Sequence, residues 1–239
     1  MIPIRDLNPT RSTPWVTWSV ILLCGLVYLW QTILPPGADR AFLFGWGLVP
    51  SRLTHLRDAV DLATVFTSMF MHGGLMHVAG NLWFLHIFGD NVEDNMGPVR
   101  FAVFYLLCGT VAAIAQVAIN PSSTIPMVGA SGAIAGVLAA YLVLYPRARV
   151  LTLIPIFVFI QWAEIPAFVF IAVWFIYQFF AGVGSLSHGG GGVAFWAHIG
   201  GFIAGLVLVF LFRRPTEPQP RIVVRRAPGS TPWRDDPRW

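Results

Sequence analysis

Six apolar runs divide this chain, and they constrain its fold more than any other feature of the sequence. Each is close to the roughly 20 residues that an α-helix needs to cross a hydrocarbon core. Because 56% of all residues are hydrophobic and only 11% are charged, a soluble globular protein is excluded. We therefore expect an all-α polytopic membrane protein with six transmembrane helices. The runs lie near residues 15–34, 75–91, 99–119, 129–145, 164–182 and 194–212.

Three parts of the chain are distinguished by composition. Residues 1–14 form a polar N-terminal segment, residues 15–212 hold the six runs, and residues 213–239 form an Arg- and Pro-rich tail that we expect to be disordered. The long first loop, about residues 35–74, is apolar and proline-rich, so we expect it to lie at the membrane interface. The glycine-dense connection at residues 183–193 is either a plain linker or a movable lid.

The orientation of the bundle follows from its basic residues, all of which are arginines. If the N-terminus is cytoplasmic, twelve of the 15 fall on the inner side and three on the outer side, namely Arg40, Arg52 and Arg57. This asymmetry agrees with the positive-inside rule. We therefore expect both termini in the cytoplasm, with the tail next to anionic lipid and not bound to nucleic acid. A bacterial inner membrane is the expected location.

A few polar side chains interrupt the apolar runs, and they lie at one depth. Ser131 and His198 each stand fifteen residues before the inner end of their run, and Asn81 stands fourteen before the inner end of its own. His77 precedes Asn81 by one helical turn and shares its helix face, whereas His86 falls on the opposite face. Polar side chains inside a membrane are costly, so this shared depth predicts a functional site.

Ser131 begins its run in the stretch GASGAIAG, and we expect it at a helix N-terminus. There the unpaired backbone N–H groups and the helix dipole favour negative charge, as the oxyanion of an acyl-transfer intermediate requires. Serine is a weak nucleophile unless a general base is near, and His198 is the candidate base at matching depth. Asn81 and His77 are candidate donors to the oxyanion. The sequence therefore predicts a hydrolytic site.

The fourth run is short, which predicts a cavity. From Ser131 to Tyr145 a helix rises about 22 Å, less than the hydrocarbon thickness of about 30 Å. The preceding segment, NPSSTIPMVG, contains two prolines and cannot be a lipid-exposed helix, so we expect it to line a water-filled cavity. Small residues four positions apart should let the fourth and sixth helices pack closely. These residues are Gly132, Gly136, Gly201 and Gly205.

Each motif also has a simpler interpretation when it is taken alone. GASGAIAG is typical of helix packing with a serine N-cap, and His198 and Asn81 are singly more typical of interhelical hydrogen bonding. Independent origins do not explain their common depth, so a catalytic site is favoured. The sequence contains no HExxH zinc motif, no GxGD motif and no Gly-rich phosphate loop.

Taken in order, the motifs resemble those of the rhomboid family of intramembrane serine proteases, of the bacterial six-helix type. HVAGN at 77–81 is similar to the HxxxN element of the family, and EDNMG at 93–97 to its ExxxG element. GASG at 129–132 is similar to the GxSG motif around the nucleophile, and AHIGGFIAG at 197–205 to the AHxxGxxxG motif around the base. The resemblance covers about residues 15–212.

This resemblance implies an endopeptidase that cleaves transmembrane protein substrates through an acyl-enzyme on a Ser131–His198 dyad, with no metal or organic cofactor. The active site is expected to open toward the extracytoplasmic side. The implied partners are a transmembrane protein substrate and membrane lipid. The resemblance implies an oxyanion hole formed by Asn81, His77, Ser131 and Gly129. It implies supporting roles for His72, Glu93, Gly97, Gly132, Gly201 and Gly205.

Two positions depart from the pattern of the family. The first loop lacks the Trp-Arg dipeptide of many members and has Trp46 and Arg52 apart. Ala135 stands four residues after Ser131, where some members place an aromatic ring against the catalytic histidine. The orientation of His198 must then depend on other packing.

Two alternatives from other functional classes remain. The first is a catalytically inactive rhomboid-like protein that binds and escorts membrane clients, although such relatives typically lack the serine or the histidine, and both are present here. The second is a small transporter, for which the sequence shows no inverted repeat.

Overall fold

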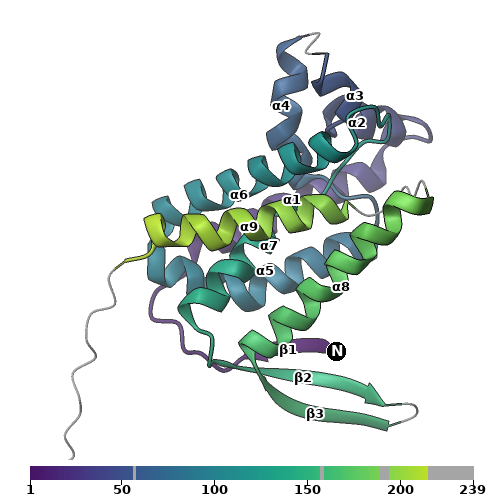
Figure 1. Ribbon diagram of the computed structural model, residues 1–239. Coiled ribbons are helices and arrows are strands. Elements are labelled where there is room, and N and C mark those ends of the chain that lie inside the picture. Colours follow the sequence, from purple (N-terminus) through teal and green to yellow (C-terminus); the bar gives the residue numbers. More distant parts are fainter. Residues whose placement is uncertain (56–57, 157–158, 189–193, 215–239) are drawn as a thin grey trace, which may run out of the picture.

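The computed structural model describes residues 1–55, 58–156, 159–188 and 194–214, which form a mostly helical bundle (Figure 1). Each of the six apolar runs is a helix. Four of the helices agree closely with the predicted ranges, whereas α5 and α8 extend further toward their C-termini. The bounds are α1 Trp15–Ile33, α5 Leu75–Met96, α6 Pro98–Ile119, α7 Ser131–Leu144, α8 Ala167–His188 and α9 Phe195–Phe212.

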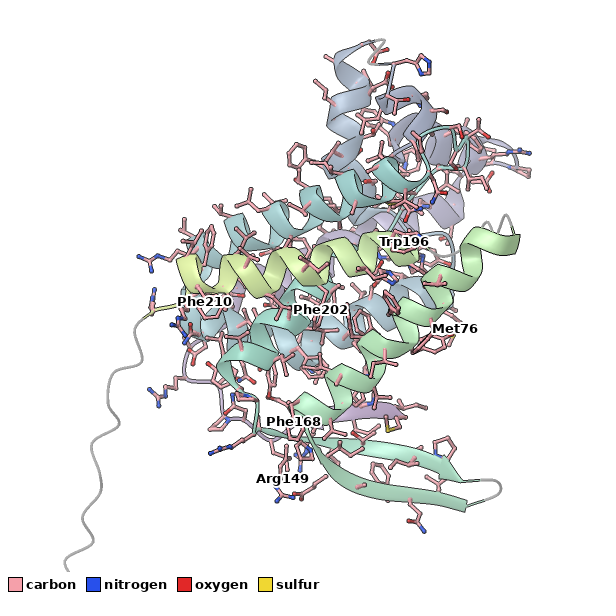
Figure 2. The ribbon with its side chains drawn as sticks, viewed as in Figure 1. Met76, Arg149, Phe168, Trp196, Phe202 and Phe210 are labelled. Atoms are coloured by element: carbon pink, nitrogen blue, oxygen red, sulfur yellow. The ribbon has the colours of Figure 1, made fainter. Side chains whose placement is uncertain are left out.

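The outer surface of the bundle is apolar. Met76, Phe168 and Phe210 lie on the outside with half or more of each residue exposed, whereas Phe202 is buried among the helices (Figure 2). Within the described residues, three helices are long and apolar enough to cross a membrane, namely α1, α6 and α9. An apolar surface of this extent requires lipid around it. The chain is therefore an integral membrane protein, as the sequence predicts.

Helix α7 lies at the centre of the bundle. Every residue from Gly132 to Tyr141 is buried, and α5, α6, α8 and α9 all contact this helix. A helix that is hydrophobic on all sides suits such a position, because each face meets another helix. The element that begins with Ser131 is thus held from every side.

The close approach of α7 and α9 depends on glycine. A side-chain carbon on Gly201 would collide with the carbonyl oxygen of Gly132, and one on Gly205 would collide with the carbonyl oxygen of Gly136. On its other side, a carbon on Gly136 would lie 2.5 Å from the Cβ of Cys108 in α6. Backbones can approach this closely only where side chains are absent, so the predicted small-residue interface is confirmed.

A three-stranded sheet packs beside the helices, and the sequence analysis did not predict it. It consists of β1 (Ile2–Asp6), β2 (Arg149–Ile156) and β3 (Phe159–Pro166), in the order β1-β2-β3 with both pairs antiparallel. The all-α prediction is therefore corrected to a mostly helical fold. The hairpin segment is apolar almost throughout, so it lacks the alternation that marks a strand, and β1 pairs with residues that are distant in sequence.

Residues near the N-terminus contact the bundle through several half-buried hydrogen bonds, two of which involve residues of β1. The indole Nε1 of Trp83 in α5 donates to the carbonyl oxygen of Pro3 at 2.6 Å. The hydroxyl of Tyr141 in α7 donates to the carboxylate of Asp6 at 2.7 Å. The polar N-terminal segment thus contributes to the packing of the bundle.

Glu93 and Gly97 occupy the end of α5 that faces the start of α1. The carboxylate of Glu93 accepts hydrogen bonds from the backbone N–H groups of Val16 and Thr17 at 2.9 and 2.7 Å. It therefore caps the first turn of α1 and ties that helix to α5. Gly97 has a φ of 80°, a conformation that favours glycine, and it turns the chain from α5 into α6. Both residues therefore contribute to the packing of α5 against its neighbours in the chain.

The first loop is folded into short helices. Arg52 links them, because its Nη1 donates to the carbonyl oxygen of Phe44 at 2.6 Å and its Nη2 pairs with the carboxylate of Asp61 at 2.7 Å. An arginine without an adjacent tryptophan therefore still ties this loop together. The elements are α2 Ala38–Trp46, α3 Pro50–Leu53, α4 Ala59–Thr67 and the 3-10 turn η1 Ser68–Phe70.

Replacing Gly201 by alanine should destabilise the protein, because the added methyl group has no space against Gly132. Overpacking of this kind costs about 1–3 kcal/mol. We expect the melting temperature of the purified protein in detergent to fall by several degrees. The matched control is Gly25→Ala in α1, where an added carbon meets nothing within 4 Å. Equal melting temperatures for the two variants would contradict the close packing of α7 on α9.

Candidate active site

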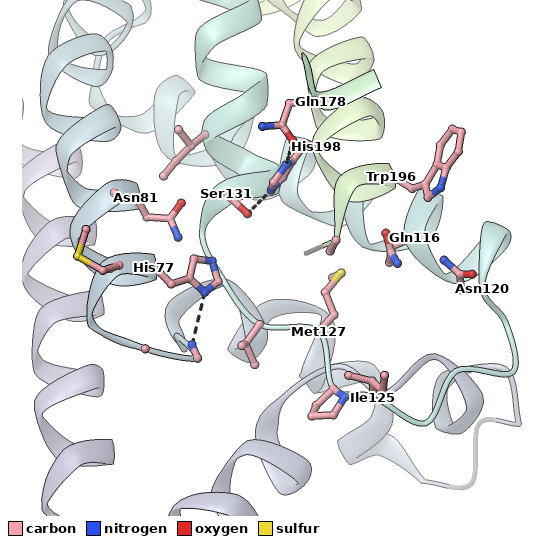
Figure 3. A pocket seen from close by; sticks show the side chains of 18 of the residues that line it. His77, Asn81, Gln116, Asn120, Ile125, Met127, Ser131, Gln178, Trp196 and His198 are labelled. Carbon is pink, nitrogen blue, oxygen red and sulfur yellow. Dashed lines mark hydrogen bonds between the residues drawn. The ribbon is translucent and has the colours of Figure 1, made fainter. Parts of the chain in front are cut away.

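Ser131 and His198 form a hydrogen-bonded pair at one end of the bundle. Ser131 is the first residue of α7, and His198 lies in the first turn of α9. The Oγ of Ser131 and the Nε2 of His198 are 2.7 Å apart (Figure 3). At this distance a histidine can take the proton of a serine hydroxyl. The two side chains that the sequence places at one depth are therefore in contact.

The pair faces a cavity of ≈ 1220 Å³. Side chains of α5, α6, α7, α8 and α9 line it, together with the segment that precedes α7 (Figure 3). The cavity predicted from the short fourth run is present, and the proline-containing segment forms part of its wall, as expected. Residues of that segment in the wall are Asn120, Ser122, Ser123, Ile125, Pro126, Met127 and Val128.

His77 and Asn81 line the same cavity from α5. The backbone N–H of Gly73 donates to Nδ1 of His77 at 3.4 Å, so the ring proton resides on Nε2, which can donate. The amide nitrogen of Asn81 is buried and has no hydrogen-bond partner among the residues that the structure describes. A buried donor without a partner is costly, so this nitrogen is available to a ligand oxygen.

Gly129 leaves space for His77 beside the serine. Its φ is 130°, and a side-chain carbon here would lie 2.7 Å from the Nε2 of His77. The backbone N–H of Gly129 donates to the carbonyl oxygen of Ser68 at 2.9 Å. That N–H is therefore not free to bind an oxyanion, and the predicted donor role of Gly129 is corrected to a steric one.

His198 has a second polar partner, which the sequence analysis missed. The Oε1 of Gln178 in α8 lies 2.8 Å from the Nδ1 of His198. The rings of Trp174 and Phe195 lie 6.1 and 6.4 Å from the imidazole, between centroids. Ala135 is fully buried, and its side chain is a methyl group that provides no aromatic contact to His198. The sequence did contain a signal for this contact, because a glutamine inside an apolar run is rarely tolerated without a polar partner.

The turn before α5 is held at His72 by a glutamine that the sequence analysis also missed. The side-chain amide of Gln31 in α1 accepts from the backbone N–H of His72 at 3.2 Å and donates to its carbonyl oxygen at 3.0 Å. The His72 ring is buried and meets the ring of His77 edge-on, with 5.2 Å between centroids. Gln31 therefore fixes the turn from which His77 enters the cavity.

The arrangement suits acyl transfer. Ser131 offers an alcohol, His198 a base in contact with it, and Asn81 and His77 two side-chain donors in one cavity. The backbone N–H of Ser131 is a further donor, because the first residues of a helix have no partner within that helix. Donors fixed in advance around a developing oxyanion are the largest catalytic contribution in many enzymes.

Comparison with known proteins finds a matching family model and several similar proteins. The model of the family described as Rhomboid domain matches residues 60–215. The chain is 31% identical to RHOMBOID-like protein 1 of Arabidopsis thaliana over 184 residues, which are 69% of this chain and 41% of that protein. It is 33% identical to Inactive rhomboid protein 1 of Drosophila melanogaster over 84 residues, which are 35% of this chain and 6% of that protein.

A plastid relative shows the same partial coverage. Rhomboid-like protein 11, chloroplastic, of Arabidopsis thaliana is 30% identical over 151 residues, which are 62% of this chain and 51% of that protein. The chain thus spans about half or less of the length of these relatives.

The hydrogen bond between Ser131 and His198 predicts an activated serine. A fluorophosphonate should label Ser131 covalently, and His198→Ala should abolish the labelling because the hydroxyl then has no base. Mass spectrometry of the digested protein identifies the labelled residue. Ser123 lines the same cavity, so Ser123→Ala is the matched control and should label normally. Labelling that persists in His198→Ala would contradict the activation of Ser131.

Proposed function

Since the chain belongs to the rhomboid family, we propose that it is an intramembrane serine endopeptidase that cleaves transmembrane segments of other membrane proteins. The observation that supports this most directly is the 2.7 Å contact between Ser131 and His198 at a cavity inside an apolar bundle. The relatives include a protein named as inactive, so family membership alone does not decide between catalysis and client binding. The complete nucleophile and base pair favours catalysis.

In the proposed mechanism, the Nε2 of His198 removes the proton of Ser131 while Oγ attacks the carbonyl carbon of the scissile peptide bond. The oxyanion of the tetrahedral intermediate accepts hydrogen bonds from the Ser131 N–H, the Asn81 amide nitrogen and the Nε2 of His77. His198 then returns the proton to the departing amine. Water enters through the cavity and hydrolyses the acyl-enzyme by the same sequence of proton transfers.

The substrate must present an extended backbone. In an intact transmembrane helix each carbonyl oxygen is already hydrogen-bonded within the segment, so the scissile carbonyl is shielded from attack. A segment weakened by glycine, proline or polar residues can unwind into the cavity at lower cost. We therefore propose that cleavage occurs near such a helix-destabilised site.

The proposed arrangement in the membrane has six spans, formed by α1, α5, α6, α7, α8 and α9. We place both termini in the cytoplasm, because this orientation puts the segments that contain most of the arginines on the cytoplasmic side. The cavity then opens toward the extracytoplasmic side, since α5, α7 and α9 begin at the end of the bundle that holds Ser131. A bacterial inner membrane is the proposed location.

Ser131→Ala and His198→Ala should each abolish cleavage of a transmembrane reporter co-expressed with the protein. The alanine variants lack the nucleophile or the base, while the packing of α7 and α9 is unchanged, so the protein should still accumulate in the membrane. Immunoblotting of the reporter fragments measures the outcome. If both variants cleave as the wild type does, the assignment as a serine protease is wrong.

An inactive escort protein would behave differently in the same assay. It would bind the reporter, recovered by co-purification, and would leave it intact even in the wild type. Binding without cleavage by the wild type, together with no fluorophosphonate labelling, would favour this alternative function.

Asn81→Ala should give a partial loss of activity, because one donor to the oxyanion disappears while the nucleophile and base remain. The expected decrease in kcat is about 10-fold to 10³-fold. Asn81→Leu is the matched variant, since it keeps a similar side-chain volume and has no donor. Turnover measured in detergent on a fluorogenic transmembrane peptide should fall in both. Normal turnover in Asn81→Leu would limit Asn81 to packing.

A further inference from the structure

We propose that Gln178 is a positioning residue that selects the catalytically competent tautomer of His198, so that helix α8 forms part of the active site. The expected effect of Gln178 on catalysis rests on the proposed function, whereas the hydrogen bond to His198 does not depend on it. The Oε1 of Gln178 lies 2.8 Å from the Nδ1 of His198, and each residue is only 8% exposed. Figure 3 shows Gln178, His198 and Ser131 joined in a row by two hydrogen bonds.

The tautomer follows from the chemistry of the amide. Neutral imidazole has one N–H, on either Nδ1 or Nε2, and an amide oxygen can only accept a hydrogen bond. The contact with Oε1 therefore places the proton of His198 on Nδ1. The lone pair of Nε2 then faces the hydroxyl of Ser131, as a general base requires. The other tautomer would direct an N–H at the hydroxyl and could not remove its proton.

A neutral amide also suits the charge that develops on His198. When the imidazole takes the proton of Ser131, Nδ1–H still donates to Gln178, and the negative end of the amide dipole faces the new cation. A carboxylate at this position would stabilise the cation more strongly. However, an ionised side chain buried in an apolar bundle carries a large desolvation cost. The amide orients the base and avoids this cost.

The placement of Gln178 depends on how α8 packs against α9. Trp174, one helical turn before Gln178, contacts the His198 ring from the same face of α8. The rings of Phe175 in α8 and Phe202 in α9 stack with their centroids 4.4 Å apart. These aromatic contacts fix the position of α8 relative to α9. Displacement of α8 would therefore break the bond to Nδ1 and leave the base without orientation.

The kinetic test compares Gln178→Leu with the wild type on a fluorogenic transmembrane peptide in detergent. Leucine has a similar volume and no acceptor, so we expect kcat to fall about 10-fold or more while KM changes little. Tyr177→Leu is the matched control, since Tyr177 is the preceding residue of α8 and is 65% exposed. It should retain wild-type turnover. Wild-type kcat in Gln178→Leu would overturn the proposal.

Gln178→Glu distinguishes positioning from packing through its pH profile. Glutamate keeps the shape and the acceptor of glutamine, and its negative charge next to Nδ1 stabilises the protonated imidazole. The acid limb of the pH–rate profile should therefore move upward by about one pH unit or more, with activity recovered at alkaline pH. A side chain that merely fills space would not move this limb. An unshifted profile in Gln178→Glu would overturn the proposal.

A spectroscopic measurement tests the tautomer without any cleavage assay. Protein containing ¹⁵N-labelled histidine in nanodiscs reports which ring nitrogen of His198 holds the proton. The wild type should show Nδ1–H, and Gln178→Leu should show a mixture of tautomers or Nε2–H. A wild type protonated on Nε2 would overturn the proposal. Nδ1–H in a wild type that cleaves no reporter would refute the protease function and still support the positioning role.

Discussion

The close contact between α7 and α9 is the interaction on which the site depends. Gly201 lies against the carbonyl oxygen of Gly132, the residue that follows Ser131, and Gly201 itself is one turn after His198. A larger residue at this point would separate the two backbones and hence the alcohol from the imidazole. In lipid there is no hydrophobic effect to drive helices together, so close packing of small residues takes its place. Ser131 and His198 are thus brought together by glycines, which have no reactive side chain.

The polar groups around this contact are held by side chains from elements that surround α7. Gln31 in α1 fixes the turn before α5, and α5 in turn presents His77 and Asn81 to the cavity. Gln178 in α8 binds the far side of the His198 ring. Because a buried polar group is costly when it lacks a partner, each of these amides both stabilises and orients its neighbour. The amide nitrogen of Asn81 is one of the buried polar atoms that lack such a partner among the described residues, and it faces the cavity, which is consistent with a ligand oxygen as its partner.

The parts of the structure that could be predicted are those that follow from regular spacing along the sequence. Helix length follows from the thickness of the hydrocarbon core, and a fixed rise per residue allowed Ser131, Asn81 and His198 to be placed at one depth by counting. The sheet could not be predicted, since β1 pairs with residues far along the chain and the hairpin has no alternating pattern. Gln178 and Gln31 were missed for another reason. A glutamine in an apolar helix shows that a partner exists but not which residue it is. Two expected segments, residues 189–193 of the glycine-dense connection and residues 215–239 of the tail, lie outside the described residues.

In the proposed function, Ser131 is activated by His198 and attacks a peptide bond within a membrane-embedded substrate. The most direct measurement reconstitutes purified protein with a transmembrane substrate in liposomes and locates the cleaved bond by mass spectrometry of both fragments. We expect the wild type to cleave a single bond within or at the edge of the transmembrane segment, and Ser131→Ala to leave the substrate intact. Cleavage at the same bond and rate by Ser131→Ala would contradict the proposed function.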